Sequence, residues 1–410
     1  LPSPIAVHLL GYLDQENHGV TGLERAWDTV LAESCDQTAA VCQTTARGRL
    51  LGTAVPEIIT EQQGTGAQVK LTLDADIQRL CEGIAQLTMP RGCILVMDTA
   101  TGEILASVSM PEYDPGDVAR SIRADDTSLV NRAFATFSVG SVFKVAAALA
   151  AYENGMDWFT HDCTGSIEVD GQTYRCALGK AHGTVNLRGA LEQSCNTYFV
   201  ALGQRLGGMA LRAAASELGF GTAVPIAPNL TAGAGVVPTA KELQSTGQLS
   251  VFSFGQGSFT ATPLQITAMM NTIAAGGTYR TPRFCYGITD ADGTVTEKFQ
   301  LPAPRTVCDA ATAKVLRSML QSVVEDGIGY AAKPTGGTAA GKTGTAQTGQ
   351  FDAAGDELLN YWFSGFIPAG DPKYTITVLQ DGVLEPETSS AAIFAQIAAG
   401  LQVIEQSAPD

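Results

Sequence analysis

The sequence predicts a mixed α/β fold of the α+β type, in which one antiparallel sheet is flanked by helices. Strand-like segments occur at 93–109 and at 361–379, and the sequence between them is mostly helical in character. Such a pattern indicates a sheet closed by segments from both ends of the domain and covered by helices. The chain has 410 residues, of which 45% are hydrophobic, so it can form two or three globular domains.

The charge balance argues against nucleic acid as a partner. Acidic residues outnumber basic ones by 41 to 25, which gives a net charge of −16. A protein that neutralises phosphates needs a basic face. No apolar run reaches the roughly 18 residues that a membrane-spanning helix requires. The sequence starts at Leu1 in the middle of patterned sequence, so we expect further chain upstream of it.

The first predicted domain boundary follows a strand and a helix. The strand covers residues 69–73, and Asp74 is the expected N-cap of the helix. The expected apolar face of that helix consists of Ile77, Leu80, Cys81, Ile84 and Leu87. We therefore predict a partial N-terminal domain over residues 1–88 and a larger domain over residues 89–410.

The larger domain has a predicted hairpin at each end. In both hairpins, apolar runs of strand length are separated by a turn containing glycine. The expected elements are strands at 93–98 and 103–109 around Thr99–Gly102, strands at 361–367 and 374–379, and a last helix at 390–404.

The first candidate catalytic motif is Gly140-Ser-Val-Phe-Lys144, which opens a segment, 145–152, that is apolar on every side. A helix that is apolar all round is buried. Ser141 and Lys144 are three residues apart and therefore lie on one helical face. Since burial disfavours a charged ammonium, Lys144 is a candidate base for the Ser141 hydroxyl. Taken alone, the motif also fits a helix start with a lysine that reaches solvent.

The second motif is Ser194-Cys195-Asn196, between two helical stretches. On a tight loop, the Ser194 hydroxyl can relay a proton and the Asn196 amide can hold a substrate. A polar helix cap is the simpler interpretation of this motif alone.

The third motif is Gly341-Lys-Thr-Gly-Thr-Ala346, just before the closing strands. A strand that carries Lys342, Thr343 and Thr345, with Gly344 to admit a ligand close to the backbone, suits binding of a carboxylate. A phosphate-binding loop is the competing interpretation. Gly337 lies one residue too close to Gly341 for that pattern, although Gly336 has the required spacing. The sequence that follows is strand-like, whereas a phosphate-binding loop opens a helix.

Ser-x-x-Lys, Ser-x-Asn and Lys-Thr-Gly in this order are far more specific together than singly. Because it has these three motifs in this order, the sequence resembles the penicillin-recognising serine acyltransferases. Among these it resembles the class B penicillin-binding proteins, which are monofunctional peptidoglycan transpeptidases. Val139 departs from the family, which usually has proline there. Further matching segments are Leu10-Gly11, Gly22–Glu24, Val69–Asp74 with Gln78, Asn131–Ala133, Phe254–Gly257, Thr262–Gln265, and Trp362-Phe363 with Gly365-Phe366.

The resemblance implies a penicillin-binding transpeptidase fold, with a five-stranded antiparallel sheet, a helical subdomain and a partial N-terminal pedestal. It implies Ser141 as the nucleophile that forms an acyl-enzyme with a stem peptide and is acylated by β-lactams. Lys144 would be the acylation base, and Ser194 and Lys342 would carry the proton to the leaving amine. Asn196, Thr343, Gly344 and Thr345 would hold the substrate, with the N–H groups of Ser141 and Thr345 as the oxyanion hole.

The resemblance also implies partners and a location. Stem peptides and β-lactams are the expected ligands, and a membrane-embedded glycosyltransferase is the expected protein partner. The domain would lie on the extracytoplasmic face of the bacterial membrane, anchored by an upstream transmembrane helix. No cofactor is expected for catalysis.

Three alternative functions share the motifs. A serine β-lactamase needs a group that activates water for deacylation, in one class a glutamate followed four residues later by asparagine. None of the glutamates between Ser194 and Lys342 has that neighbour: Glu217, Glu242, Glu297 and Glu325 are followed by Gly221, Thr246, Leu301 and Gly329. A D,D-carboxypeptidase and a β-lactam sensor or cell-wall scaffold remain open.

Cysteine spacing suggests a second site. Cys163, Cys176, His182 and Cys195 lie within 33 residues and could form a closed, structural zinc site, for which His161 is an alternative ligand. Some elongation-type class B proteins resemble this in placing metal ligands near the second motif. A Cys163–Cys176 disulfide across a hairpin at 169–172 is the other interpretation. Cys35 and Cys42 could also pair.

Overall fold

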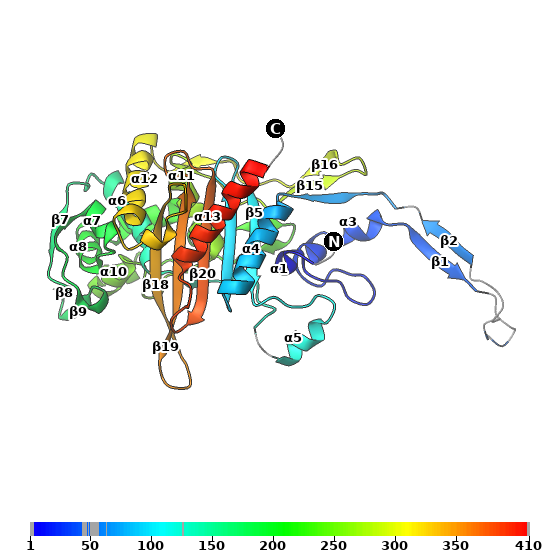
Figure 1. The fold of residues 1–410 in the computed structure, drawn as a ribbon, viewed down its shortest axis with the longest axis horizontal. Coiled ribbons are helices and arrows are strands. Elements are labelled where there is room, and N and C mark those ends of the chain that lie inside the picture. The colour runs from blue at the N-terminus through cyan, green and yellow to red at the C-terminus, as the bar shows by residue number, and fades with distance from the viewer. Residues whose placement is uncertain are drawn as a thin grey trace.

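The computed structural model describes residues 4–42, 47, 49, 57–62, 64–124 and 127–407. The molecule is elongated, with a body built around a sheet and a narrower N-terminal part that ends in a two-stranded arm (Figure 1). Within the described ranges, no helix has both the length and the apolar character that crossing a membrane requires.

The central sheet has five antiparallel strands, as predicted. Two strands from the start of the larger domain pair with strands from its end, so the first and last segments close one sheet. Both predicted hairpins are present, β4 with β5 and β19 with β20. The spatial order is β18 (Ala340–Phe351), β19 (Glu357–Ile367), β20 (Tyr374–Val383), β4 (Gly92–Asp98) and β5 (Ile104–Met110).

Helices cover both faces of this sheet. Alternate side chains of a strand point to opposite faces of the sheet, and each face has its own hydrophobic core. In β4, Ile94 lies in the core formed with α4 (Ala75–Thr88) and α13 (Ser390–Ser407), and Leu95 lies in the core on the opposite face. That second core includes α11 (Pro263–Ala274).

Helix α4 begins where the sequence predicts. The Asp74 carboxylate accepts hydrogen bonds from the backbone N–H groups of Asp76 and Ile77, which satisfies two donors of the first turn. Leu87 was expected on its apolar face, but it is 88% exposed because the helix ends at Thr88, beyond the sheet contact.

A helical subdomain lies beside β18, on the left in Figure 1. It also holds the β8–β9 hairpin, which has the turn predicted at 169–172, and the antiparallel strand pair β7–β10. Its elements are α6 (Lys144–Glu153), β7 (Thr160–Cys163), β8 (Ser166–Val169), β9 (Gln172–Arg175), β10 (Gly183–Asn186), α7 (Leu187–Glu192), α8 (Asn196–Leu206), α9 (Gly208–Glu217), α10 (Thr246–Phe252) and α12 (Ala310–Glu325).

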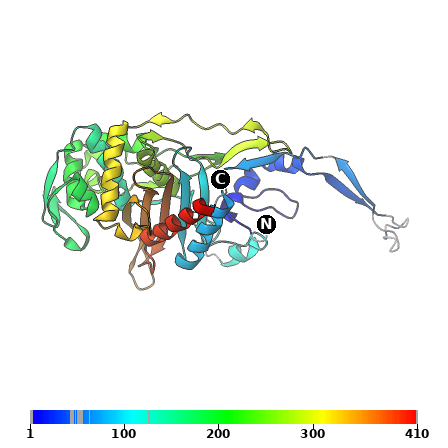
Figure 2. The same ribbon diagram turned by 45° about the horizontal axis from the view of Figure 1, so that its top comes forward.

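The N-terminal part continues into the body through a shared three-stranded sheet. Strand β15, from the later chain, lies between β3 and β16, and Figure 2 shows these segments running together toward the arm. The elements are α1 (Val7–Leu10), α2 (Gly22–Ala26), α3 (Asp28–Ser34), the arm strands β1 (Gln37–Val41) and β2 (Glu57–Gln62), β3 (Gln68–Leu71), β15 (Cys285–Thr289) and β16 (Val295–Lys298).

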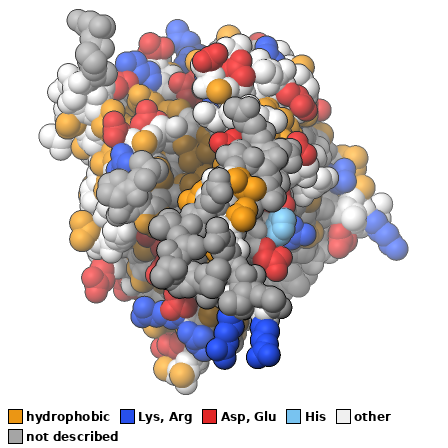
Figure 3. Space-filling view, turned by 90° about the vertical axis from the view of Figure 1, so that its right-hand side faces the viewer, with side chains coloured by type: hydrophobic (Ala, Val, Ile, Leu, Met, Phe, Trp, Pro, Cys, Tyr) orange, Lys and Arg blue, Asp and Glu red, His pale blue; other side chains and the backbone are white. Residues whose placement is uncertain are grey.

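The remaining elements are short. They are α5 (Val118–Ala124) and the strand pairs β6 (Phe137–Ser138) with β13 (Thr260–Ala261), β11 (Pro225–Ala227) with β12 (Leu230–Thr231), and β14 (Thr278–Tyr279) with β17 (Arg305–Thr306). At the arm end, acidic and basic side chains are interspersed around a hollow in which hydrophobic side chains show (Figure 3).

Candidate active site

The candidate nucleophile lies on a turn pressed against the edge strand of the sheet. Gly140–Phe143 form a 3-10 turn that leads directly into α6, which begins at Lys144. Gly140 has φ 65°, and its N–H donates to the Gly255 carbonyl at 2.8 Å. A Cβ at Gly140 would lie 2.3 Å from the Thr345 carbonyl oxygen on β18. Glycine is therefore required for the close approach of the Ser141 turn to β18.

We expect Gly140→Ala to lower thermal stability and penicillin acylation more than Gly155→Ala does. Both glycines have a positive φ, 65° and 62°, so the backbone strain of an alanine is similar at both positions. A Cβ added at Gly140 would clash with the backbone of Thr345, whereas a Cβ added at Gly155 would have no other atom within 4 Å. We expect Gly140→Ala to cost roughly 2 kcal/mol more than Gly155→Ala, as overpacking typically does. Thermal unfolding of both variants measures the difference, and equal losses would contradict the close-approach argument.

Lys144 connects the first motif to the second. Its side chain is fully buried on α6. Its Nζ donates hydrogen bonds to the Ser194 carbonyl at 2.8 Å, to Ser194 Oγ at 3.0 Å and to Asn196 Oδ1 at 2.6 Å. Among the described hydrogen bonds, none joins Lys144 to Ser141 Oγ. The structure thus brings Lys144, Ser194 and Asn196 together around one amine.

The protonation of Lys144 is strongly affected by its surroundings. Burial lowers the pKa of Lys144 to about 7, although the nearby Cys195 and Cys176 thiols oppose the shift. Near neutral pH, the amine is therefore present in both protonation states. A general base works best with a pKa near the working pH, and burial gives Lys144 that property.

Ser194 is held in an unusual backbone conformation. It lies between α7 and α8 with φ 51°, a left-handed conformation that few residues other than glycine adopt. Asn196, the first residue of α8, donates from Nδ2 to the Arg175 carbonyl at the end of β9, at 2.9 Å. The small hairpin β8–β9 therefore helps to position the second motif.

The third motif forms the first half of β18. Lys342 is fully buried, and both its burial and the nearby Lys144 charge lower its pKa well below the ordinary lysine value. Its Nζ donates to the Thr343 carbonyl at 3.2 Å and to Thr343 Oγ1 at 3.3 Å. Lys342 was predicted to act with Ser194. Among the described hydrogen bonds none joins the two residues, and the Ser194 hydroxyl accepts from Lys144.

Gly344 lies between Thr343 and Thr345 in this strand. A Cβ at Gly344 would lie 2.6 Å from a methyl group of Val142, so glycine lets the nucleophile turn pack on the strand. The exposed Thr345 lies on the other side, where its hydroxyl is free to meet a ligand.

Gln256 was not predicted to be a site residue, but it contacts the third motif. Its Nε2 donates to the Thr345 carbonyl at 3.5 Å, and the neighbouring Gly255 contacts Gly140. The loop at 254–257 therefore lies against both the nucleophile turn and β18. The matching Phe254–Gly257 segment was the available signal, but the contact depends on two loops that are distant in sequence.

The four predicted metal ligands come together behind the second motif. Their ligand atoms, three sulfurs and one imidazole nitrogen, all lie within 4.8 Å of one another. Cys163 Sγ lies 3.7 Å from Cys176 Sγ and 3.3 Å from His182 Nδ1, and Cys176 Sγ lies 3.8 Å from Cys195 Sγ. His161, the alternative ligand, is not part of this group.

The cysteine pairs considered as disulfides are not bonded. All nine cysteines are free, including Cys35 and Cys42. The 3.7 Å between Cys163 Sγ and Cys176 Sγ far exceeds the S–S bond of about 2.05 Å. In tetrahedral zinc sites with Zn–S bonds of about 2.3 Å, two sulfurs lie about 3.8 Å apart, so the donor set and its spacing fit zinc.

The chain is similar to known proteins over nearly its full length. It is 32% identical to "Penicillin-binding protein PbpB" of Mycolicibacterium smegmatis, over 97% of this chain and 63% of that protein. It is 31% identical to "Stage V sporulation protein D" of Bacillus subtilis, over 91% of this chain and 58% of that protein. The chain therefore spans about three fifths of the length of these curated relatives.

Solved structures share the fold. Penicillin binding protein 3 of Mycobacterium tuberculosis, solved in complex with aztreonam, superposes with a TM-score of 0.80 at 29% identity, over 99% of this chain and 90% of that one. The D,D-transpeptidase domain of a peptidoglycan glycosyltransferase from Eggerthella lenta gives a TM-score of 0.79 at 26% identity, over 98% of this chain and 91% of that one. The family model described as "Penicillin binding protein transpeptidase domain" matches residues 92–399. The chain therefore belongs to the transpeptidase family of penicillin-binding proteins.

Proposed function

We propose that this protein is a peptidoglycan D,D-transpeptidase that crosslinks stem peptides through an acyl-enzyme on Ser141 and is acylated by β-lactams. The observation that carries the proposal is the position of Lys144 Nζ. The amine comes from the helix that follows the Ser141 turn, and it contacts both Ser194 and Asn196. One buried amine with a pKa of about 7, three residues after the candidate nucleophile, is thereby bonded to the candidate proton relay.

In the proposed acylation, Ser141 Oγ attacks the carbonyl carbon of the penultimate D-Ala. Neutral Lys144 takes the hydroxyl proton, and the N–H groups of Ser141 and Thr345 stabilise the oxyanion. The C–N bond to the terminal D-Ala then breaks. The proton returns from Lys144 through Ser194, 3.0 Å away, to the leaving amine, and Ser141 retains the acyl group as an ester.

In the second step, the amine of a neighbouring stem peptide attacks the Ser141 ester. A new amide bond forms, the ester C–O bond breaks, and the attacking amine loses a proton that restores the Ser141 hydroxyl. Lys342 and the hydroxyls of Thr343 and Thr345 are suited to hold the carboxylate of the terminal D-Ala, because a buried amine and two hydroxyls, all hydrogen-bond donors, lie along one strand.

The relatives extend the proposal to location and partners. Among them are proteins named as peptidoglycan D,D-transpeptidases, including FtsI of Escherichia coli. We infer that this domain works on the extracytoplasmic face of the bacterial membrane and acts beside a membrane-embedded glycosyltransferase. Its net charge of −16 means that attraction of an anionic substrate depends on local groups such as Lys342.

A peptide assay separates this function from its alternatives. The protein is incubated with a peptide ending in D-Ala-D-Ala, with and without an amine-bearing acceptor peptide. We expect a crosslinked peptide and one released D-Ala per crosslink, and neither product from Ser141→Ala. Release of D-Ala without crosslinks in the presence of acceptor would indicate a carboxypeptidase, and sustained hydrolysis of penicillin would indicate a β-lactamase.

We also propose a structural zinc ion held by Cys163, Cys176, His182 and Cys195. Three sulfurs and one ring nitrogen at these separations form a closed tetrahedral donor set. Zinc would fix Cys195, which lies between Ser194 and Asn196, and thereby support the second motif. Native mass spectrometry of protein purified without chelator is expected to find about one zinc per chain.

A further inference from the structure

A polar cavity lies next to the nucleophile turn, on the side of β6. Its volume is about 310 Å³. Phe137 and Ser138, which lead into the turn, form part of its wall, and Thr348 of β18 forms another part. Arg91, Arg132 and Asp381 also line it. The mechanism proposed above uses none of these side chains.

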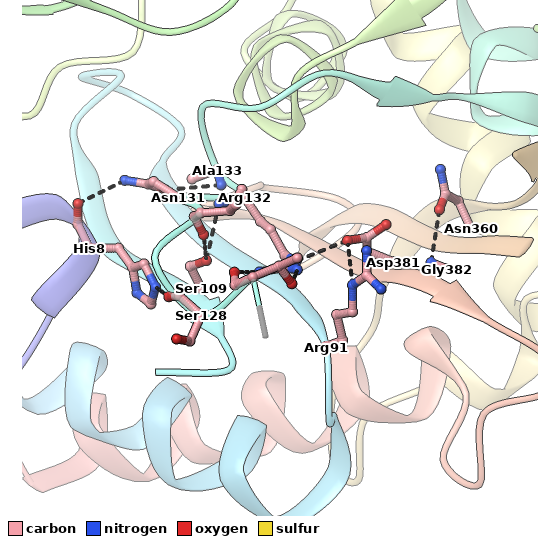
Figure 4. A network of polar contacts seen from close by, with 12 residues as sticks. His8, Arg91, Ser109, Ser128, Asn131, Arg132, Ala133, Asn360, Asp381 and Gly382 are labelled. Carbon is pink, nitrogen blue, oxygen red and sulfur yellow. Dashed lines mark hydrogen bonds and ion pairs between the residues drawn. The ribbon is translucent and has the colours of Figure 1, made fainter. Parts of the chain in front are cut away.

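The charges of this cavity are unequal. Asp381 Oδ2 accepts from Nε of the buried Arg132 at 2.9 Å and from Nε of Arg91 at 3.0 Å, so two guanidinium groups share one carboxylate oxygen (Figure 4). The charged residues that line the cavity are Arg91, Arg132 and Asp381, so the described lining carries one more positive charge than negative charges. In a chain with a net charge of −16, a positive cavity is a local feature that attracts an anion.

Arg91 retains the donors for such an anion. Arg132 donates its Nη groups to the Thr127 carbonyl and hydroxyl, at 3.2 and 2.8 Å. Arg91 is only 35% exposed and has its one described hydrogen bond at Nε. Its two Nη groups therefore have no partner among the described residues. Paired Nη donors on a planar guanidinium match a carboxylate.

The position of the cavity suggests where that carboxylate comes from. In the proposed function, the terminal D-Ala carboxylate lies near Thr343, and the reacting carbonyl lies at the N–H groups of Ser141 and Thr345. The upstream part of the donor peptide must then leave on the far side of Thr345. Thr348 is three residues farther along β18, where the pairing of the strand shifts register. Three strand residues span about 10 Å, which an extended peptide covers in about three residues, here the reacting D-Ala and the two residues before it.

We propose that this cavity is a subsite for a carboxylate carried by the donor stem peptide two residues upstream of the reacting D-Ala. Arg91 binds the carboxylate through its Nη groups, and Arg132 and Asp381 fix the orientation of Arg91. The subsite rests on the proposed transpeptidase function. It makes Arg91 a specificity-determining residue that distinguishes a free carboxylate at this position from its amide.

Two donor peptides test the subsite. Both end in D-Ala-D-Ala and carry a γ-linked residue two positions upstream of the reacting D-Ala, which is D-glutamate in one and D-isoglutamine in the other. The readout is the peptide concentration that halves the rate of Ser141 labelling by a fluorescent penicillin. We expect the carboxylate form to protect at about tenfold lower concentration, the effect of one charge-assisted pair.

Variants connect that difference to the cavity. We expect Arg91→Gln to reduce the ratio between the peptides to about twofold or less and Arg91→Lys to leave an intermediate ratio. Arg79→Gln, which removes a surface guanidinium whose one described ion pair is with Asp76, is expected to keep the full ratio. Equal protection by both peptides, protection by neither, or a full ratio in Arg91→Gln overturns the subsite. Absence of penicillin labelling in the unmodified protein would instead overturn the proposed function.

Discussion

Replacing Lys144 with alanine is expected to lower the rate of Ser141 acylation by penicillin by about 100- to 10,000-fold, the usual contribution of a general base. The variant loses the amine that contacts Ser194 and Asn196. It should still fold, because removing a buried amine also removes the cost of desolvating it. Stopped-flow labelling with a fluorescent penicillin measures the rate, and thermal unfolding checks the fold.

An exposed lysine provides the matched control. Lys314→Ala on α12 removes one positive charge from an exposed side chain outside the three motifs and is expected to leave the acylation rate unchanged. A Lys144→Ala protein that is acylated at the normal rate would contradict the assignment of Lys144 as the base.

The assignment of Lys144 as the base also predicts how the acylation rate depends on pH. Lys144 acts as a base only when neutral, and burial lowers its pKa to about 7. The acylation rate should therefore rise as the pH increases through about 7 and level off above it. A rate that falls over this interval, or that is constant from about pH 5.5 to 8.5, would show that another group accepts the Ser141 proton.

Removing the proposed zinc ion is expected to weaken both the fold and the active site. Chelation or His182→Ala should lower the unfolding temperature by at least about 5 °C, equivalent to about 2 kcal/mol for a domain of this size. Acylation should slow by about tenfold, because Cys195 connects the metal site to Ser194 and Asn196. Calorimetry and penicillin labelling measure the two effects.

His18→Ala is the matched control, because His18 is 60% exposed in the N-terminal part of the chain. It should leave the zinc content, stability and acylation unchanged. A metal-free protein two hydrogens lighter than the free-thiol form, destabilised by reduction and indifferent to chelation, would show a disulfide in place of zinc.

The features that sequence predicted well are local. The Ser141–Lys144 spacing, the Asp74 cap and the hairpin around Thr99–Gly102 depend on residues a few positions apart, whose geometry the backbone fixes. The four-ligand cluster was also predictable, because cysteine and histidine within one short segment have few other uses.

The features that sequence did not predict depend on long-range packing. Arg132 and Asp381 are 249 residues apart, and nothing in either local sequence indicates that the two pair. The hydrogen bond from Lys144 to Ser194 depends on how α6 packs beside α8, which periodicity does not specify. Leu87 was misassigned because an apolar position at the end of a helix can extend beyond the surface that the helix covers.

The most direct test of the central claim is the intact mass of the protein after treatment with penicillin. A nucleophile with a buried base and no described group that activates water should be acylated once and stay acylated. We expect a mass increase equal to one whole penicillin molecule, located on Ser141 by peptide mapping and persisting for hours after free penicillin is removed. Rapid loss of the adduct with accumulation of hydrolysed penicillin, or an adduct on a different serine, would contradict the account.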